Sequence, residues 1–387
     1  MRIAFITETF LPKVDGVVTR LVRTLDALEA LGHEVLVLAP PRAPARYGGF
    51  PVASAPGLPF PWYPELTVAL PSARLARIAA SFRPDVVHVI NPVFFGTWGA
   101  LWARSRRLPL VASFHTDPKV VRDLGLGWFQ RPLEVLDREV HNLADVNLAT
   151  SPQMVRLARG LNIRRVRLWP KAVDSRRFRP EQATPAMRAR LTGGEVERPL
   201  VVYAGRVSFE KRVDVLAEAA KRLPGVRFAV VGEGPARDWL ERELAGTGTV
   251  FTGFLEGDAL ADAYASADVF AFPSDSETLG FAALEAMAAG VCVVAARAGG
   301  IPHIVKDGAN GVLVPPGDAG ALADAIRALL NDAARRRRLA ACGRTDSEKW
   351  SWEASTRELV RLYGAARRLH GGGREGDAAA AREARAA

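Results

Sequence analysis

The chain has 387 residues, of which 49% are hydrophobic and 24% charged, a balance typical of a globular protein that excludes disordered and fibrous classes. This length suffices for two domains of ordinary size. The formal net charge of +10 suits nucleic acid, an anionic membrane surface or a phosphorylated substrate, but no recognised nucleic-acid motif accompanies it.

Four absent features narrow the class of protein further. The two cysteines, Cys292 and Cys342, are too few for a disulfide framework, and no Cys/His cluster has the spacing of a metal site. The apolar run that opens the chain is interrupted by Thr7 and Glu8, so it does not resemble a signal peptide. No stretch approaches the roughly 18 apolar residues of a membrane span. We therefore expect a cytoplasmic protein.

Short apolar runs alternate with stretches of 3.6-residue periodicity in the first half of the chain. This alternation predicts a parallel sheet with helices on both faces. The expected strands are 2–7, 35–39, 85–90, 110–114, 145–150 and 166–169, and the expected helices are 16–31, 72–81, 96–106 and 117–142.

A second alternating series follows a segment rich in Pro, Thr, Gly and mixed charge at 181–198, which is typical of a linker. Its expected strands are 200–204, 227–231, 250–252, 269–272, 291–295 and 311–314, and its expected helices are 213–223, 236–245, 259–265, one that ends at Gly290, and 319–330.

These patterns predict an α/β protein made of two doubly wound, Rossmann-like domains that face a central cleft. We expect the N-terminal domain at 1–190 and the C-terminal domain at 191–348. A helix at 349–370 is expected to pack back on the N-terminal domain. The low-complexity segment 371–387, rich in Gly, Ala, Arg and Glu, is expected to be a disordered tail.

Two glutamates follow the strand expected at 269–272. Glu277 lies in the polar loop after this strand, and Glu285 lies on the next helix. Ligands of open α/β sheets bind at the carboxyl ends of the strands. Two carboxylates there are able to accept hydrogen bonds from the vicinal hydroxyls of a ribose or another sugar. The alternative is that Glu285 is only a solvated helix residue.

A second loop combines cations with the start of a helix. Arg206 and Lys211 follow the strand expected at 200–204. Cations at a helix N-terminus oppose the macrodipole by about 0.3–1 kcal/mol each. Their placement makes sense if a phosphate is held by both cations and by the free amides of the helix. The alternative is an ordinary solvated pair.

The first domain offers two further candidates. His115 follows the strand expected at 110–114 and is either structural or catalytic, and Gly16 at the first helix would let the backbone approach a phosphate or sugar closely. A dinucleotide site is disfavoured, because Arg237 replaces the third glycine of the turn that begins at Gly232. No G-x-S-x-G nucleophile elbow supports a serine hydrolase.

In this order and spacing the motifs resemble retaining glycosyltransferases of family 4, over roughly residues 1–365. The resemblance rests on Gly205-Arg206 with Glu210-Lys211, on Glu277 and Glu285 with seven residues between them, and on Gly299-Gly300-Ile301-Pro302. Other segments resemble sulfolipid synthases, which move sulfoquinovose from UDP to diacylglycerol, and bacterial lipid mannosyl- and glucuronosyltransferases. These segments are Pro61-Trp62-Tyr63, His115-Thr116-Asp117, residues 168–174, and residues 264–270 leading into 276–281.

The resemblance implies the GT-B fold and a retaining transfer from a nucleotide-diphosphate sugar, with a UDP-sugar favoured, to a lipid or glycan acceptor such as diacylglycerol on the N-terminal domain. A GDP-mannose-dependent α-mannosyltransferase is the alternative. The resemblance implies no metal and no other cofactor. The implied site is Arg206, Lys211 and Gly16 on the diphosphate, Glu285 on the ribose, Leu255 on the ribose or base, Glu277 with the amides of Leu279, Gly280 and Phe281 on the donor sugar, and His115 near the reacting carbon.

Two alternatives of other classes remain. An isomerase of the sugar-nucleotide 2-epimerase type shares the two-domain build and would convert its nucleotide sugar without an acceptor. A non-catalytic phosphate- or nucleic-acid-binding protein would use the net charge and would bind nucleic acid with a steep salt dependence. The resemblance implies no nucleic-acid partner.

One apolar segment predicts contact with an anionic membrane, because peripheral docking needs apolar area together with basic charge. Docking would place the protein on the inner face of the cell membrane. The alternative is that the apolar side chains pack against the core. The segment contains Leu124, Leu126, Trp128 and Phe129, with Lys119, Arg122 and Arg131 nearby.

Overall fold

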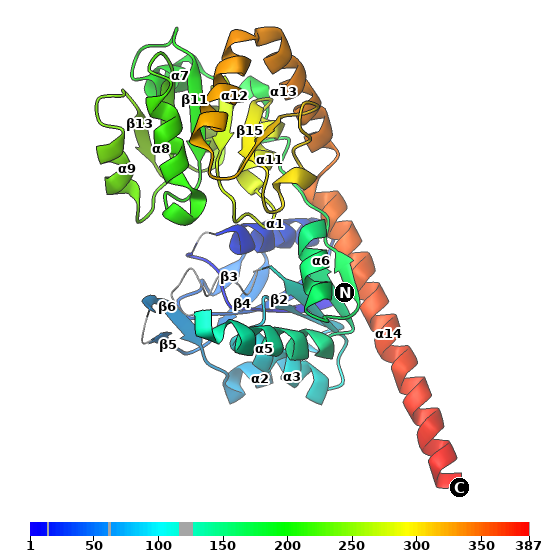
Figure 1. Ribbon diagram of the computed structural model, residues 1–387. Helices are drawn as coiled ribbons and strands as arrows, with labels where there is room; N and C mark the ends of the chain where they lie inside the picture. The colour runs from blue at the N-terminus through cyan, green and yellow to red at the C-terminus, as the bar shows by residue number, and fades with distance from the viewer. Residues whose placement is uncertain (14, 61–62, 116–126, 387) are drawn as a thin grey trace. The chain divides into compact units, whose positions relative to one another are not determined.

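The computed structural model describes residues 1–13, 15–60, 63–115 and 127–386 (Figure 1). The chain divides into two compact units: unit 1 consists of Met1–Pro170 and Trp352–Ala387, and unit 2 consists of Lys171–Ser351.

The division between the units differs from the expected boundary at 190/191. Residues 171–190 belong to unit 2, because Val173, Phe178 and Met187 are buried in its hydrophobic core. The segment expected to be part of the first domain therefore packs with the second.

Unit 1 is built on an eight-stranded sheet with the strand order β10-β9-β8-β7-β1-β2-β4-β3. Its pairs are parallel except β3 with β4, and β5 and β6 form a separate antiparallel pair. The strands are β1 (Arg2–Thr7), β2 (Glu34–Ala39), β3 (Arg46–Tyr47), β4 (Phe50–Ser54), β5 (Gly57–Phe60), β6 (Tyr63–Ala69), β7 (Val86–Ile90), β8 (Leu110–Phe114), β9 (Val146–Ala149) and β10 (Val166–Leu168).

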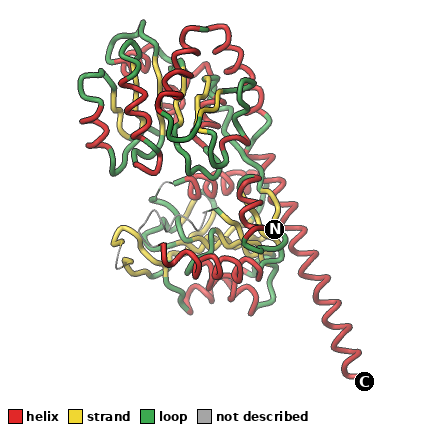
Figure 2. Tube along the Cα trace, in the orientation of Figure 1, coloured by secondary structure: helices red, strands yellow, loops and turns green. Residues whose placement is uncertain are grey.

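Helices cover both faces of this sheet (Figure 2). One face packs against apolar side chains of α1 and α14, and the other packs against those of α2, α3 and α5. The helices of unit 1 are α1 (Gly16–Ala30), α2 (Ala73–Phe82), α3 (Phe95–Ser105), a 3-10 turn η1 (Gly127–Phe129), α5 (Gln130–Leu143), α6 (Pro152–Gly160) and α14 (Trp352–Ala386).

The C-terminal helix α14 is anchored in unit 1. Leu359, Tyr363 and Ala366 are fully buried in the core that also holds α1. The helix extends to Ala386, and the disorder expected of 371–387 stays a prediction.

Unit 2 is built on a six-stranded parallel sheet with the order β13-β12-β11-β14-β15-β16. Two apolar clusters, one on each side of the sheet, form its core. The strands are β11 (Leu200–Ala204), β12 (Arg227–Val231), β13 (Val250–Gly253), β14 (Val269–Phe272), β15 (Cys292–Ala296) and β16 (Val312–Val314). The helices are α7 (Pro185–Thr192), α8 (Val213–Lys221), α9 (Arg237–Glu243), α10 (Gly257–Ala265), α11 (Phe281–Ala288), α12 (Ala319–Asn331) and α13 (Ala333–Glu348), with 3-10 turns η2 (Pro180–Gln182), η3 (Phe209–Lys211) and η4 (Ile301–His303).

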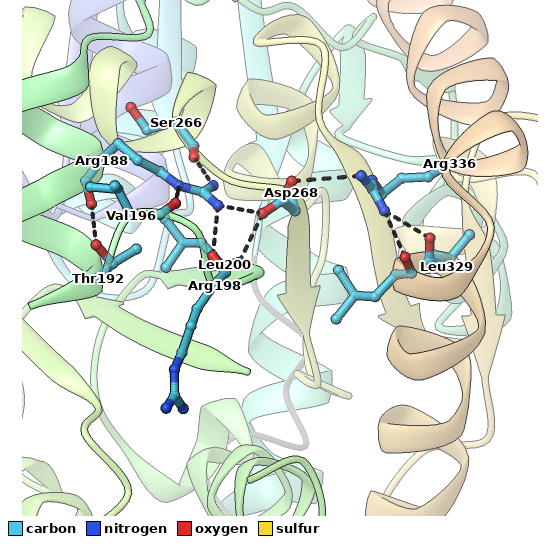
Figure 3. Close-up of polar contacts among 10 residues, drawn as sticks. Arg188, Thr192, Val196, Arg198, Leu200, Ser266, Asp268, Leu329 and Arg336 are labelled. Carbon is cyan, nitrogen blue, oxygen red and sulfur yellow. Dashed lines mark hydrogen bonds and ion pairs between the residues drawn. The ribbon is translucent and has the colours of Figure 1, made fainter. Parts of the chain in front are cut away.

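Asp268 joins several elements at the amino end of β14 (Figure 3). Its carboxylate accepts from the amide of Leu200 at 2.8 Å and lies 2.9 Å from the guanidinium of Arg188 on α7 and 3.7 Å from that of Arg336 on α13. The same two guanidiniums donate to backbone carbonyls of the linker and of α12, including that of Arg198. Asp268 therefore compensates two cations that are three-quarters or more buried.

Replacing Asp268 by Ala is expected to lower the free energy of unfolding by about 2–4 kcal/mol, because both guanidiniums lose their counter-ion and one buried amide loses its acceptor. Urea denaturation of the full chain measures this. Asp324→Ala is the matched control, since Asp324 is 74% exposed in its pair with Arg327 and such pairs contribute at most about 1 kcal/mol. Equal losses in the two variants would contradict the structural role of Asp268.

Candidate active site

The strand order of unit 2 locates a switch point. Numbered along the chain, its strands lie in the order 3-2-1-4-5-6, so the chain moves outward from β11 in one direction and then resumes from β14 in the other. In doubly wound sheets, ligands bind outside the carboxyl ends of the strands at this point. The loops that emerge there are 205–212 after β11 and 273–280 after β14.

The structure brings the cation and the carboxylate of these two loops together. Nζ of Lys211 donates to Oε1 of Glu277 at 2.7 Å, and both side chains are largely buried, with 24% and 16% exposed. Their pairing holds a charged donor and a charged acceptor in fixed positions at the switch point. The ammonium retains two further N–H groups and the carboxylate a second oxygen with which to bind a ligand.

Further contacts hold the two loops against each other. The hydroxyl of Ser276 donates to the carbonyl of Glu210 at 3.0 Å. Arg212 donates to Asp275 at 2.8 Å and contacts Asp214 at 3.1 Å. The sequence alone does not predict these contacts, since only the fold makes the two loops neighbours.

Arg206 lies on the first of these loops, and its side chain makes only a loose ion pair. Its guanidinium is 3.7 Å from Glu210, and both side chains are about half exposed, so the ion pair contributes little and does not compete strongly with an anionic ligand. The backbone is held more firmly, because the hydroxyl of Tyr203 donates to the carbonyl of Arg206 at 2.7 Å. Burial, followed by the charges of Glu277 and Glu210, raises the pKa of Tyr203 and keeps this hydroxyl protonated.

Two glycines support the backbone of Glu277. The amide of Gly300 donates to the carbonyl of Glu277 at 2.7 Å. A Cβ at Gly299 would lie 2.2 Å from that same carbonyl oxygen, and a Cβ at Gly300 would lie 2.3 Å from the carbonyl oxygen of Thr278. No side chain fits at either position without moving the loop that carries Glu277.

Helix α11 begins beside this loop. Gly280 precedes it with φ +81°, and no side chain caps its N-terminus. Leu279 is buried and Phe281 partly buried. The amides at this helix start form the kind of site that binds negatively polarised oxygens.

Glu285 lies one turn into α11 and is oriented by a buried tyrosine. The hydroxyl of Tyr264 on α10 donates to Oε2 of Glu285 at 3.0 Å. Burial, with the charge of Glu285 as the next cause, raises the pKa of Tyr264 well above its usual value, so the hydroxyl remains a donor. Glu285 is only partly exposed, which favours a fixed carboxylate over the solvated alternative. Leu255, after β13, is partly buried against the core on the same side of the sheet.

Gly16 and His115 belong to unit 1. Gly16 is the first residue of α1, and the carboxylate of Asp15 already accepts from the amides of Val17 and Val18 at 2.9 Å. His115 follows β8 and is buried, with Nε2 2.9 Å from the hydroxyl of Ser113. Thr116 and Asp117, which continue the histidine motif, lie outside the described residues.

The described part of the chain shows neither a metal-binding cluster nor a membrane-spanning helix. No three or more His, Cys, Asp and Glu side chains gather there as a group able to hold a metal ion. No helix among the described residues is both long and apolar enough to cross a membrane.

Comparison with known proteins identifies the family. Residues 198–332 match the family described as Glycosyl transferases group 1, and residues 14–177 match Glycosyltransferase Family 4. The chain is 37% identical over 356 residues to a sulfoquinovosyl transferase of Arabidopsis thaliana, covering 89% of this chain and 70% of that protein. It is 36% identical over 371 residues to a GDP-mannose-dependent alpha-mannosyltransferase of Mycolicibacterium smegmatis, covering 94% and 97%.

Solved structures share the fold over most of the chain. A sucrose-phosphate synthase of Thermosynechococcus elongatus aligns with a TM-score of 0.78 and 24% identity, covering 94% of this chain and 98% of that one. The Anabaena protein HepE, solved with UDP and glucose, aligns with a TM-score of 0.77 and 20% identity, covering 94% and 99%. The chain therefore belongs to glycosyltransferase family 4: it is a glycosyltransferase with the GT-B fold of two Rossmann-like domains.

Proposed function

We propose that the protein is a retaining, metal-independent glycosyltransferase that moves a sugar from a nucleotide-diphosphate donor, with a UDP-sugar favoured, to a glycerolipid such as diacylglycerol. The observation that carries the proposal is the Lys211–Glu277 pair at the switch point of unit 2, with Arg206 on the same loop as Lys211. A nucleotide sugar supplies an anion for the cations and hydroxyls for the carboxylate.

Arg206 and Lys211 would bind the diphosphate and stabilise the charge that grows on it as the glycosidic bond breaks. Stabilisation of this kind is usually the largest electrostatic contribution to catalysis. The two cations supply charge that a metal ion would otherwise supply. We propose front-face attack assisted by the leaving phosphate, so no side chain is assigned as a nucleophile.

The other side chains of unit 2 would recognise the rest of the donor. Glu277 and the amides of Leu279, Gly280 and Phe281 would bind the hydroxyls of the transferred sugar. Glu285 would accept from the ribose hydroxyls, and Leu255 would contact the ribose or base. In unit 1, His115 would contact the sugar near the reacting carbon, and Gly16 would approach the diphosphate.

The names of two relatives bear on the identity of the transferred sugar. The Arabidopsis relative is named a sulfoquinovosyl transferase, and the Mycolicibacterium relative a GDP-mannose-dependent mannosyltransferase. UDP and the lipid acceptor come from the resemblance to sulfolipid synthases, with which the first name is consistent. The second name makes a GDP-mannose-dependent α-mannosyltransferase the second candidate.

A donor screen tests these candidates. The purified full chain is incubated with UDP-sulfoquinovose, UDP-glucose, UDP-glucuronate or GDP-mannose, with and without diacylglycerol and with EDTA present. We expect release of UDP with EDTA present, increased by the lipid, and an α-linked product by NMR. Preference for GDP-mannose would select the second candidate. Conversion of the nucleotide sugar without acceptor and without nucleotide release would indicate an isomerase and overturn transfer.

We further propose that unit 1 docks on an anionic membrane surface through η1 and the start of α5. The side chain of Trp128 is 74% exposed and that of Val135 is 49% exposed, and Arg131 between them is exposed as well. This combination supplies the apolar area and basic charge that peripheral docking needs. Lys119, Arg122, Leu124 and Leu126, expected to contribute, lie outside the described residues.

Replacing Trp128 by Asp and Arg131 by Glu together is expected to reduce co-sedimentation with phosphatidylglycerol-containing liposomes at least about tenfold, because apolar burial and charge attraction are lost together. The matched control is Leu369→Asp with Arg368→Glu, an exposed Leu–Arg pair on α14. Equal liposome binding by the wild type and both variants would contradict docking through this surface.

A further inference from the structure

Among the described residues, His115 has a hydrogen-bond partner on one of its two ring nitrogens. Nε2 lies 2.9 Å from Oγ of Ser113, which is fully buried on β8. The ring of Trp169 packs edge-on against the imidazole, at 5.9 Å between centroids and 82° between planes. Nδ1 has no hydrogen-bond partner among the residues that the structure describes.

The hydrogen bond with Ser113 selects one tautomer. In the described part of the chain, the Ser113 hydroxyl has no acceptor other than Nε2 of His115. If Nε2 carried the proton, it would donate to Oγ and leave the buried hydroxyl hydrogen without an acceptor, at a cost of about 1–3 kcal/mol. Donation from Ser113 to Nε2 avoids this cost. The proton of the neutral ring then resides on Nδ1.

A buried cation lies behind this assembly. Arg20 of α1 is 1% exposed, its Cζ lies 4.0 Å from the ring centroid of Trp169, and Nη2 donates to the carbonyls of Trp169 and Pro170 at 3.1 and 2.7 Å. No carboxylate pairs with it among the described residues, and its Nε and Nη1 have no partner there. Arg20 therefore holds Trp169 in place and contributes a positive charge that no described carboxylate balances.

The surroundings of His115 oppose its protonation. Burial is the largest cause that lowers its pKa, followed by the charge of Arg20 on α1, then His88 on β7 and His141 on α5. None of these groups is a carboxylate. Burial also lowers the pKa of His88 to about 3 and that of His141 to about 4, so both are neutral near pH 7.

We propose that Ser113 and Arg20 are positioning residues that hold His115 as a neutral imidazole with its proton on Nδ1, so that Nδ1–H donates to a hydroxyl of the transferred sugar. The identity of the ligand rests on the proposed function. The state of the ring does not, because it follows from contacts within unit 1.

The ring state is tested first without substrate. The full chain is labelled with ¹⁵N-histidine, and the His115 signals are assigned by their loss in His115→Gln. We expect the Nδ1–H tautomer and a pKa of His115 well below that of a free histidine, because burial and the charge of Arg20 oppose protonation. In Ser113→Ala the tautomer populations should shift, and in Arg20→Met the titration midpoint should rise by about one pH unit. Thr24→Val is the control, since buried Thr24 on α1 donates only to the carbonyl of Arg20 and should leave both readouts unchanged.

Sugar transfer is measured second. Ser113→Ala should lower kcat about 3–10-fold with a smaller change in the donor KM, and Arg20→Met should add an acidic limb to the pH profile. An Nε2–H tautomer in the wild type would overturn the proposal, as would unchanged spectra in both variants. A correct ring state with unchanged kcat in Ser113→Ala would overturn the role toward the sugar. A correct ring state without any transfer would instead contradict the proposed function.

Discussion

Replacing Lys211 by Met is expected to lower kcat/KM for the nucleotide-sugar donor about 10²–10³-fold, the loss typical of removing one donor that stabilises a developing oxyanion. Two effects combine. The diphosphate loses a cation, and Glu277, now without its partner at 2.7 Å, presents an uncompensated negative charge to the anionic ligand. Steady-state kinetics with the preferred donor measure this effect.

A double-mutant cycle shows whether the pair acts as a unit. Glu277→Gln alone should also lower kcat/KM strongly, and the double variant should lose less than the product of the two single losses, because neither charge is then left unpaired. Lys221→Met is the control. Lys221 ends the helix that follows Lys211, and within the described part of the chain it pairs with Glu218 and Glu243 on the surface. If Lys211→Met behaved like Lys221→Met, the assignment of the diphosphate site would be wrong.

Replacing Glu285 by Ala is expected to raise the donor KM about 10–100-fold with a smaller effect on kcat, because hydrogen bonds to a charged group contribute about 1.5–3 kcal/mol and the ribose lies away from the reacting bond. Tyr264→Phe should raise KM by about 2–5-fold, since it removes only the hydroxyl that orients the carboxylate. Binding of UDP or GDP by calorimetry gives the same comparison without turnover.

The control for this prediction is Glu241→Ala, because Glu241 lies on α9 in an exposed pair with Arg237. It should leave both constants unchanged. A Glu285→Ala variant that is folded and has an unchanged donor KM would contradict the ribose assignment and support the solvated alternative.

The sequence patterns do not predict strands β3, β4 and β5 or helix α6, and each case has a physical reason. None of the expected strands falls in the proline-rich stretch 40–64, yet β3, β4 and β5 form there. Pro51 and Pro59 lie in short strands paired with antiparallel neighbours at the sheet edge or outside it, where proline is tolerated. Helix α6 was missed, although Ser151 as N-cap followed by Pro152 is a clear start signal.

Alternating periodicity was sufficient to predict two parallel α/β domains, because each strand and helix is encoded by apolar residues close together in the chain. The charged residues at strand ends were likewise visible, since Arg206, Lys211 and Glu277 each follow a strand that the sequence predicts.

Only the tertiary structure decided that β14 lies next to β11, which brings Lys211 within 2.7 Å of Glu277 across 66 residues of sequence. It also assigned residues 171–190 to unit 2 and placed Arg20, Ser113 and Trp169 around His115. The physical reason is that strand order and burial depend on contacts between distant segments, which local propensity does not encode. The amino-acid sequence by itself therefore determined which residues carry charge at the strand ends, and the strand order within the sheet of unit 2 decided that Lys211 and Glu277 meet.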